Sequence, residues 1–245
     1  KQHIEDVAIV CGDDVICLEM AKQFIEIEPL MFGHLKEYDA YICESDIYLR
    51  QQGKLEKYDL AGSALDNHIG RLNSAAAIMA ARACGCEQAV IEKELRIFKP
   101  LPHRMELVDV IEGVRYCNDS KATNTGAVMS ALRQARGNIV LIAGGRDKGD
   151  DYRLLRPVVK EKVKKLILIG EAATQMYAQL HDVVSTDYAD SLEDAVFLAC
   201  KEAVYGDTVL LSPACASFDM FDSYGHRGQV FRESVKRFRT EFKCN

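Results

Sequence analysis

Residues 208–224 read Thr-Val-Leu-Leu-Ser-Pro-Ala-Cys-Ala-Ser-Phe-Asp-Met-Phe-Asp-Ser-Tyr, a short apolar run that continues into small, hydroxylated and aromatic residues. The run 208–211 predicts a buried strand, and residues 212–224 predict the loop that leaves it. In an open α/β sheet, ligands bind beyond the carboxyl ends of the strands, where such loops lie. A buried strand with an ordinary polar turn would give the same pattern, so other parts of the chain must decide between the two interpretations.

The composition is that of a soluble globular protein. The 245 residues suffice for one large domain or two smaller ones. The formal net charge of −6 argues against a broad nucleic-acid surface, and no apolar run approaches the roughly 18 residues of a membrane span. No signal-peptide pattern opens the chain, and Lys1 stands where an initiator Met would be expected. We therefore expect a cytoplasmic protein that is not inserted in a membrane, and a piece of a longer chain.

Nine cysteines are scattered along the chain, most of them in apolar segments. Cys84-Gly-Cys86 is too closely spaced for the usual zinc pair, and no second pair of Cys or His follows it. The odd number and the scatter are typical of buried, reduced thiols in a cytoplasmic protein. The sequence therefore predicts no metal site built on cysteine.

Lys99-Pro-Leu-Pro102 interrupts regular structure and predicts a domain boundary between residues 98 and 99. Before it, the hydrophobic pattern predicts strands at 7–11, 41–43 and 47–49 and helices at 15–24, 69–84 and 87–98. After it, the pattern predicts a hairpin of strands 107–111 and 114–117, strands 139–143, 166–170, 183–185 and 208–211, and helices 126–134, 152–159, 172–181, 192–203 and 229–242. This alternation predicts right-handed βαβ units and a mostly parallel sheet covered on both faces.

Three of the predicted strands lead into loops with unusual chemistry. Two of these loops are Asn118-Asp-Ser-Lys-Ala-Thr-Asn124 and Gly144-Gly-Arg-Asp-Lys-Gly149, and the third is the segment 212–224. Because the carboxyl ends of parallel strands share one edge of a sheet, we expect the loops to converge. Their polar residues include Asp119, Lys121, Thr123, Arg146, Lys148, Ser212 and Ser217. A cationic balance within an acidic chain indicates an anionic ligand.

Taken singly, each loop also has an ordinary structural explanation. Asp119-Ser120 could cap the following helix, and Lys121 and Lys148 could be solvated loop charges. Gly144-Gly145 could simply permit a tight turn, and it is not a dinucleotide fingerprint because no third glycine follows at the required spacing. Cys215 could be a nucleophile, but no His lies nearby in sequence, so a packed thiol is favoured. The joint occurrence of the three loops favours a ligand site.

Together with Leu101-Pro-His-Arg-Met-Glu106, these loops resemble the motifs of the Mur ligases. The other matching stretches are 118–124, 144–149 and Leu211-Ser-Pro-Ala-Cys-Ala-Ser-Phe-Asp-Met-Phe221, in the order and spacing of the family. Within the family, these motifs are similar to those of the ligases that add D-glutamate. The resemblance covers residues 99–245 almost wholly and residues 1–98 more weakly.

The resemblance implies a domain organisation. Mur ligases have an N-terminal UDP-binding domain, a central ATPase domain with a P-loop and a C-terminal Rossmann-like domain. Residues 1–98 would be the C-terminal part of the α/β ATPase domain, and residues 99–245 would be the Rossmann-like ligase domain, a mostly parallel sheet with helices on both faces. The P-loop pattern Gly-x-x-x-x-Gly-Lys-[Ser/Thr] does not occur in the chain. The P-loop, the UDP-binding domain, the Mg²⁺ ligands and the carbamylated lysine of the family are therefore expected upstream of Lys1.

The resemblance also implies ATP-dependent amide formation in peptidoglycan precursor synthesis. ATP phosphorylates the alanyl carboxylate of UDP-N-acetylmuramoyl-L-alanine, the amine of D-glutamate attacks the acyl phosphate, and phosphate leaves. ATP and Mg²⁺ are thus the expected cofactors, and the UDP-linked substrate and D-glutamate are the expected partners. A monomer is expected, and the 245 residues alone are expected to be inactive.

By resemblance, the expected catalytic residues are Arg104, Asp119 and Lys121. Arg104 matches the arginine that reaches the ATP phosphates, a task that suits a permanent cation. Asp119 matches the acidic residue on the nucleotide side, at the ribose. Asn73 matches one of two asparagines that hold adenine, whereas Gly70 stands where the family has the other, a departure from its pattern.

The acceptor amino acid is expected to meet a second set of residues. Lys148 matches the lysine that pairs with one D-glutamate carboxylate, and Ser217 with the backbone at Phe218 matches the binding site of the other. Tyr224 stands where the family usually has Phe, which adds a hydroxyl to an aromatic wall. The full set expected at the substrate is Lys121, Thr123, Lys148, Ser217, Phe218 and Tyr224.

Two other functions stay open from the residues alone. A Rossmann-like domain can serve as a non-catalytic binding module for a ligand or partner, and an upstream reading frame that encodes a P-loop would argue against this. A nucleotide-dependent oxidoreductase is disfavoured by the missing Gly-x-Gly-x-x-Gly, and a test of nicotinamide binding would decide it.

Overall fold

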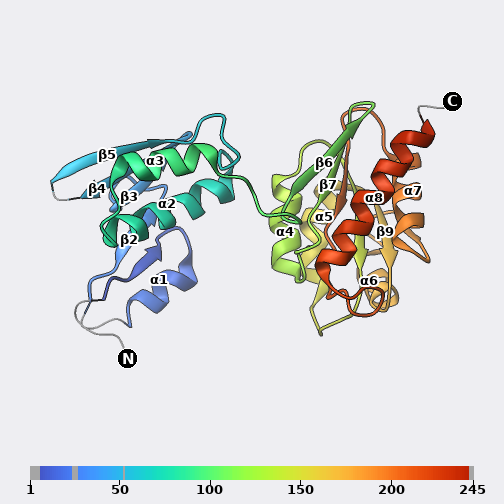
Figure 1. Ribbon diagram of the computed structural model, residues 1–245. Helices are drawn as coiled ribbons and strands as arrows, with labels where there is room; N and C mark the ends of the chain where they lie inside the picture. Colours follow the sequence, from blue (N-terminus) through green and yellow to red (C-terminus); the bar gives the residue numbers. More distant parts are fainter. Residues whose placement is uncertain (1–5, 24–26, 52, 243–245) are drawn as a thin grey trace. The chain divides into compact units, whose positions relative to one another are not determined.

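The computed structural model describes residues 6–23, 27–51 and 53–242, and the chain divides into two compact units, Lys1–Pro100 and Leu101–Asn245 (Figure 1). The division lies two residues beyond the predicted boundary. Pro100 and Pro102 flank it, and because each fixes φ and lacks an N–H, the chain between them belongs to no helix or strand. Each unit has its own sheet and its own hydrophobic core.

The first unit is a five-stranded sheet in the order β1-β2-β3-β4-β5. Strands β1 to β3 are parallel, and β3 to β5 are antiparallel. Its elements are β1 Ile9–Cys11, α1 Val15–Ala21, β2 Leu30–Gly33, β3 Ala40–Cys43, β4 Asp46–Gln51, β5 Lys54–Asp59, α2 His68–Ala83 and α3 Gln88–Ile97. Helix α2 contacts β1 to β4, and its buried Ile78 and Met79 are part of the core of this unit.

Two strands of the first unit are not predicted by the sequence pattern. In β5, an edge strand, only Tyr58 is buried, so its polar residues hide the alternation. The four residues of β2 are all apolar or glycine and show no alternation at all. The helix predicted over 15–24 ends at Ala21, and Phe24 lies outside the described residues.

The second unit is a six-stranded sheet in the order β10-β9-β8-β11-β7-β6. All neighbours are parallel except β6, which forms the predicted antiparallel hairpin with β7. Its elements are β6 Glu106–Ile111, β7 Val114–Asn118, α4 Thr125–Gln134, β8 Ile139–Gly144, the 3₁₀ helix η1 Tyr152–Leu155, α5 Arg156–Lys162, β9 Val163–Ile169, α6 Ala173–Leu180, β10 Thr186–Tyr188, α7 Leu192–Glu202, β11 Thr208–Leu211 and α8 Tyr224–Phe242.

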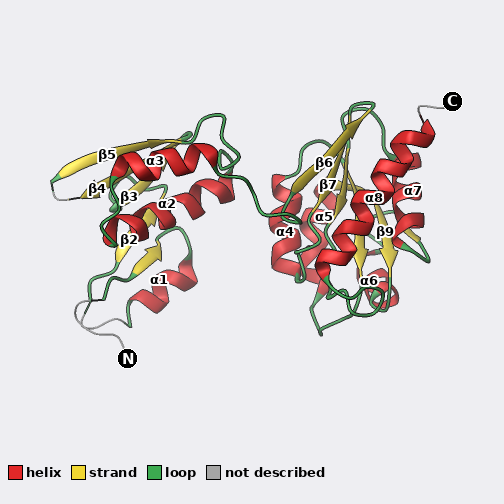
Figure 2. Cartoon of the chain, in the orientation of Figure 1, coloured by secondary structure: helices red, strands yellow, loops and turns green. Residues whose placement is uncertain are grey.

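Helices cover both faces of this sheet, as predicted (Figure 2). Successive residues of β8 face opposite ways, because side chains alternate along a strand. Leu141 and Ala143 pack with residues of α4, α5 and α6, whereas Val140 and Ile142 pack with residues of α7 and α8. Every residue of β8 and β11 is buried, which explains why both strands appear in the sequence as continuous apolar runs.

Strand β11 marks the point where the chain changes faces. It lies between β7 and β8, whose chains continue to α4 and α5 on one face, whereas the chain after β11 continues to α8 on the other. The loops that leave these neighbouring strands therefore part in opposite directions. Such a switch point at the carboxyl edge is where open α/β sheets bind ligands.

Two predicted elements are misplaced. The apolar pair Val183-Val184 is not a strand, because both N–H groups bond Leu180 O at the end of α6, and the strand follows as the polar edge segment β10. Helix α8 begins at Tyr224, five residues before its predicted start. Gly225 and Gly228 lower the helix propensity there, but a Cβ on Gly228 would overlap the His103 ring, so the glycine permits close packing.

The described helices include none long and apolar enough to cross a membrane. The longest, α8, has five charged residues between positions 232 and 239, none of them buried, so this part of its surface is strongly polar.

Gly144 ends β8 with a φ of 116°, and a Cβ there would overlap the carbonyl oxygen of Ile169 in β9. Because the backbone must shift to relieve the overlap, Gly144→Ala is expected to lower the free energy of unfolding by about 2 kcal/mol or more. The matched control is Gly149→Ala, which has a φ of 82° but nothing within 4 Å of the added Cβ, and about 1 kcal/mol is expected. Urea unfolding measures both. Equal losses would show that the overlap with Ile169 is unimportant.

Candidate functional site

Backbone hydrogen bonds join the predicted loops at the carboxyl edge of the sheet. Ala214 N donates to Ala122 O over 2.9 Å and links the exits of β11 and β7. Arg146 and Ala216 exchange N–H···O bonds of 2.9 and 3.2 Å and link the exits of β8 and β11. The convergence of the three loops is therefore confirmed.

The segment around Arg104 forms a fourth part of this cluster. Lys121 N donates to His103 O over 3.1 Å, and Met105 N donates to Asp119 Oδ1 over 3.1 Å. His103 and Met105 have φ values of 64° and 45°, a left-handed conformation that costs a residue with a Cβ about 1–2 kcal/mol. The bonds to the β7 exit hold this conformation, and Arg104 between them is exposed.

Asp119 lies beneath this segment, only 7% exposed. Its Oδ1 accepts the Met105 N–H, and its Oδ2 accepts a hydrogen bond of 3.0 Å from Ser212 Oγ. Burial raises the pKa of the carboxyl to about 6, against the lowering effect of these bonds and of the Arg104 charge. With both oxygens engaged, Asp119 fastens the Arg104 segment to the exit of β11. Its contact with a nucleotide stays a prediction.

The helix after this loop is capped by Asn124, whose Oδ1 accepts from Ala127 N over 2.8 Å. The capping explanation is therefore wrong for Asp119 and Ser120. Ser120 is fully buried, and its Oγ donates to Tyr224 O over 2.8 Å. Because Asn124 supplies the cap, both preceding side chains are left to make tertiary contacts.

Lys121 and Tyr224 are brought together from the exit of β7 and the start of α8. Lys121 Nζ lies 4.0 Å from the centroid of the Tyr224 ring, within the range of a cation–π interaction. A hydrogen bond from Lys121, together with its charge, lowers the pKa of the Tyr224 hydroxyl. A phenylalanine at position 224 would keep the ring contact and lose this polar one.

A buried arginine in α8, Arg227, ties the exits of β7 and β11 together. Its Nε donates to Ser120 Oγ over 3.0 Å, and its Nη2 donates to Ser120 O and Cys215 O over 2.9 and 3.1 Å. Its Nη1 donates to Ala216 O over 3.2 Å. Burial lowers the pKa of the guanidinium to about 10, so it stays charged at neutral pH.

The other predicted substrate residues lie on the converging loops. Ser217 is 2% exposed, and Phe218 beside it is 63% exposed. Lys148 is exposed in the exit of β8, and Thr123 is half-buried in the exit of β7. The structure thus places all four at the carboxyl edge of the sheet, and their contacts with a substrate stay predictions.

Asn73 lies in the first unit, exposed on α2. Gly70, one turn earlier, is buried, and a Cβ there would overlap the carbonyl oxygen of Leu65. An asparagine at position 70 would therefore not fit the present backbone. The contact of Asn73 with adenine stays a prediction.

Cys215 is a packing residue. It is fully buried, and its Sγ lies 3.2 Å from the Tyr152 hydroxyl. Burial raises the pKa of its thiol to about 11, so the thiolate that a nucleophile needs is scarce.

The expectation of buried thiols is wrong for three other cysteines, Cys43, Cys84 and Cys86, which are exposed. They lie at the end of a strand and just after a helix, where apolar sequence does not mean burial. All eight cysteines among the described residues are free, and Cys244 lies outside that part of the chain.

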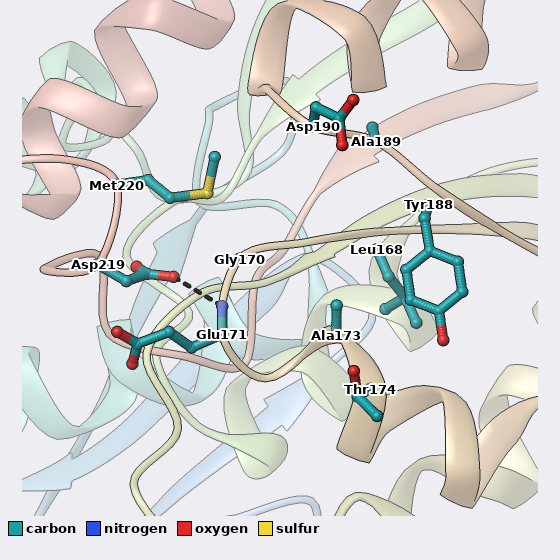
Figure 3. A pocket seen from close by; sticks show the side chains of 10 residues that line it. All are labelled: Leu168, Gly170, Glu171, Ala173, Thr174, Tyr188, Ala189, Asp190, Asp219 and Met220. Carbon is teal, nitrogen blue, oxygen red and sulfur yellow. Dashed lines mark hydrogen bonds between the residues drawn. The ribbon is translucent and has the colours of Figure 1, made fainter.

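A separate pocket of about 460 Å³ opens at the carboxyl ends of β9 and β10 (Figure 3). Its charged lining residues are Glu171, Asp190 and Asp219, and Asp219 Oδ2 accepts from Glu171 N over 3.0 Å. Glu171 is paired with Arg146 over 3.1 Å, and Asp190 and Asp219 would repel a dicarboxylate. Lys121 and Lys148, the lysines of the converging loops, suit such an anion better.

Three residues that organise the site have no role in the sequence analysis: Glu106 and Asn118 lie in the quoted motifs without an assigned part, and no pattern singles out Arg227. Glu106 Oε2 accepts from His103 N and from Arg232 Nη2, both over 3.0 Å, and Asn118 Nδ2 donates to Gly228 O over 3.1 Å. An arginine in a helix usually belongs to a solvated face. The one available signal is the glycine after Arg227, because a glycine inside a helical pattern can mark close packing.

Comparison with known proteins finds a family model for the second unit and relatives for nearly the whole chain. The family model described as "Mur ligase, glutamate ligase domain" matches residues 103–215. A UDP-N-acetylmuramoylalanine–D-glutamate ligase of Desulfotalea psychrophila is 50% identical over 235 residues, which are 96% of this chain and 51% of the relative. A protein of the same name from Koribacter versatilis is 38% identical over 246 residues, or 99% of this chain and 54% of the relative. The chain thus spans about half the length of the curated relatives it matches.

Solved structures show the same fold at low identity. The MurF ligase of Thermotoga maritima in complex with ADP is 16% identical with a TM-score of 0.62, and the match covers 94% of this chain and 54% of that one. A pseudomurein peptide ligase type C from Methanothermus fervidus is 13% identical with a TM-score of 0.67, covering 95% of this chain and 56% of that one.

The raised pKa of Asp119 predicts a pH dependence of stability. Below about pH 4 the Asp119 carboxyl is protonated whether the chain is folded or not. Between pH 4 and 6 it ionises only in the unfolded chain, because its pKa in the folded chain is about 6. The free energy of unfolding that this group contributes at low pH is therefore lost as the pH rises toward 6. Asp119→Asn is expected to abolish this loss, a difference of about 2–3 kcal/mol in the pH dependence of the unfolding free energy.

Urea unfolding from pH 4 to pH 8 measures this dependence. Asp222→Asn is the control, because its side chain is 95% exposed. An Asp119→Asn variant whose stability follows pH as the unmutated chain does would contradict the assignment.

Proposed function

This chain belongs to the Mur ligase family, and we propose that it supplies the acceptor half of a ligase that joins D-glutamate to UDP-N-acetylmuramoyl-L-alanine at the expense of ATP. The observation that carries the proposal is the convergence of three strand exits at the switch point of the sheet, with Lys121 and Tyr224 in contact. The printed names of the two relatives support the choice of substrates. We further propose that the enzyme works in the cytoplasm.

The acceptor, D-glutamate, carries two carboxylates and an amine. Lys148 is exposed at the exit of β8 and free to pair with one carboxylate, a charge-assisted contact. The segment at Ser217 and Phe218 offers a hydroxyl and backbone N–H groups for the other carboxylate. Tyr224 and Lys121 would form the wall of the site beside the reacting amine.

In the proposed reaction the site must hold the amine against the acyl phosphate and stabilise the negative charge that develops on the carbonyl oxygen. Attack forms the C–N bond, the carbonyl oxygen takes up negative charge in a tetrahedral intermediate, and the C–O bond to phosphate then breaks. Lys121 sits on a loop fixed by its own N–H to His103 O. We assign its ammonium group to the stabilisation of that oxygen, which needs a cation held in place beforehand.

We assign contact with the ATP phosphates to Arg104 of the second unit. We also propose that the first unit is the C-terminal part of an ATP-binding domain, in which Asn73 contacts adenine. The solved MurF ligase that shares this fold is titled as a complex with ADP. Mg²⁺ belongs to the proposed reaction, but we assign it no ligand here, because no group of three or more His, Cys, Asp or Glu among residues 6–23, 27–51 and 53–242 is arranged for a metal ion.

The proposed function predicts a role for Lys148 in the complete ligase, that is, this chain together with the ATP-binding segment that the reaction requires. Lys148→Ala removes a charge-assisted hydrogen bond worth roughly 1.5–3 kcal/mol, so kcat/KM for D-glutamate is expected to fall about ten- to over a hundredfold. The KM values for ATP and for the UDP-linked substrate should change little. Steady-state kinetics with each substrate varied in turn would measure this.

The control is Lys160→Ala, which removes an exposed lysine from α5 and is expected to leave all three KM values as they are. If Lys148→Ala used D-glutamate with unchanged KM and kcat, Lys148 would have no part in acceptor binding.

The proposed function also makes a prediction for the 245 residues alone. They contain no Gly-x-x-x-x-Gly-Lys-[Ser/Thr] to cradle the ATP phosphates, so they are expected to release no ADP when given ATP, D-glutamate and the UDP-linked substrate. The same assay on the complete ligase is the positive control. ADP release by the 245 residues that depends on both acceptor and UDP-linked substrate would refute the assignment of ATP binding to another segment.

A further inference from the structure

We propose that Arg227 is the positioning residue that sets the spacing of the D-glutamate-binding loops. The inference rests on the proposed function of the same site. Arg227 is fully buried in α8 and is not expected to touch a substrate. It acts through the residues to which it donates hydrogen bonds.

Two of its three partner residues, Ser120 and Ala216, are sequence neighbours of residues expected at the substrate. Ser120, which accepts from Nε and Nη2, precedes Lys121 in the exit of β7. Ala216, which accepts from Nη1, precedes Ser217 in the exit of β11. One planar group thus fixes the distance between the cation assigned to the reacting centre and the hydroxyl assigned to a carboxylate.

The same network reaches two further parts of the site. Ser120 Oγ, which accepts from Arg227, donates in turn to Tyr224 O, so the aromatic wall is held as well. Ala216, beyond its bond to Arg227, pairs with the backbone of Arg146 in the loop that carries Lys148. Hydrogen bonds therefore connect all three strand exits, directly or through one residue, to the Arg227 side chain.

The set of hydrogen bonds from Arg227 to Ser120, Cys215 and Ala216, called the bridge below, requires a guanidinium. Its donors point in several fixed directions in one plane and reach a hydroxyl and three carbonyl oxygens, whereas lysine carries its donors on one nitrogen. Among the described residues, no carboxylate forms an ion pair with it, which is unfavourable for a buried charge in stability terms alone. This charge, opposed in part by that of Asp219, lies under a site that we assign to a dicarboxylate, where it adds to the attraction.

The test is steady-state kinetics of the complete ligase carrying Arg227→Lys or Arg227→Met. Both variants lose the bridge, so the KM for D-glutamate is expected to rise about tenfold or more, with the larger rise in Arg227→Met, which also loses the charge. The KM values for ATP and the UDP-linked substrate are expected to stay within about twofold, a pattern that general unfolding does not give.

Two further variants keep the test decisive if Arg227 variants fold poorly. Ser120→Ala removes one acceptor of the bridge and leaves the buried charge, and a smaller rise of the KM for D-glutamate is expected, about threefold. Arg239→Met is the matched control, because it takes an arginine and its salt bridge to Asp109 from the same helix. Its three KM values should match those of the unmutated ligase, and thermal unfolding of every variant accompanies the kinetics.

The outcomes separate the two proposals. If the unmutated ligase does not consume D-glutamate, the proposed function fails. If it does, but the KM for D-glutamate in Arg227→Lys and Ser120→Ala stays within twofold of the unmutated value, the positioning role is overturned. A joint rise of all three KM values would overturn it too, because it would show a structural role without preference for the acceptor.

Discussion

The buried carbonyl groups beyond β7 and β11 impose the constraint on which the rest of the site depends. At the edge of a parallel sheet the ladder ends, and buried backbone oxygens must find other donors. Arg227 provides them for Ser120, Cys215 and Ala216 at once. The loops can therefore turn away from the sheet in opposite directions and still remain packed against each other.

Backbone strain gathers at the same place. His103, Met105 and Ala214 all have positive φ, although none is a glycine, and such conformations persist only where the surroundings over-determine them. Here the surroundings are bonds from neighbouring loops, such as Ala214 N to Ala122 O and Met105 N to Asp119 Oδ1. Hydrogen bonds between the folded loops thus hold backbone conformations that an isolated segment would not keep.

Sequence alone predicts the strands that are fully buried and the loops that carry recognisable motifs. The fully buried β8 and β11 appear as unbroken apolar runs, and the parallel sheet predicts the convergence of the loops after them. The contact between Lys121 and Tyr224 is seen only in the structure. The polar edge strand β10 has no such signature and is misplaced. Gly228 signals close packing beside Arg227, but the role of Arg227 cannot be found from its sequence surroundings, because its partner Ser120 lies 107 residues away. Long-range bonds of this kind leave no periodic trace.

The glycine at position 70 has an evolutionary consequence. Its Cα faces the Leu65 carbonyl oxygen, and the turn before α2 is closed by bonds such as Asn67 N to Leu65 O over 2.8 Å. An asparagine at position 70, which the family pattern leads us to expect, would require this turn to move in the same step. Gly70→Asn alone is therefore expected to destabilise the start of α2 on this background. Lineages that keep the asparagine are expected to differ in residues 63–67 as well.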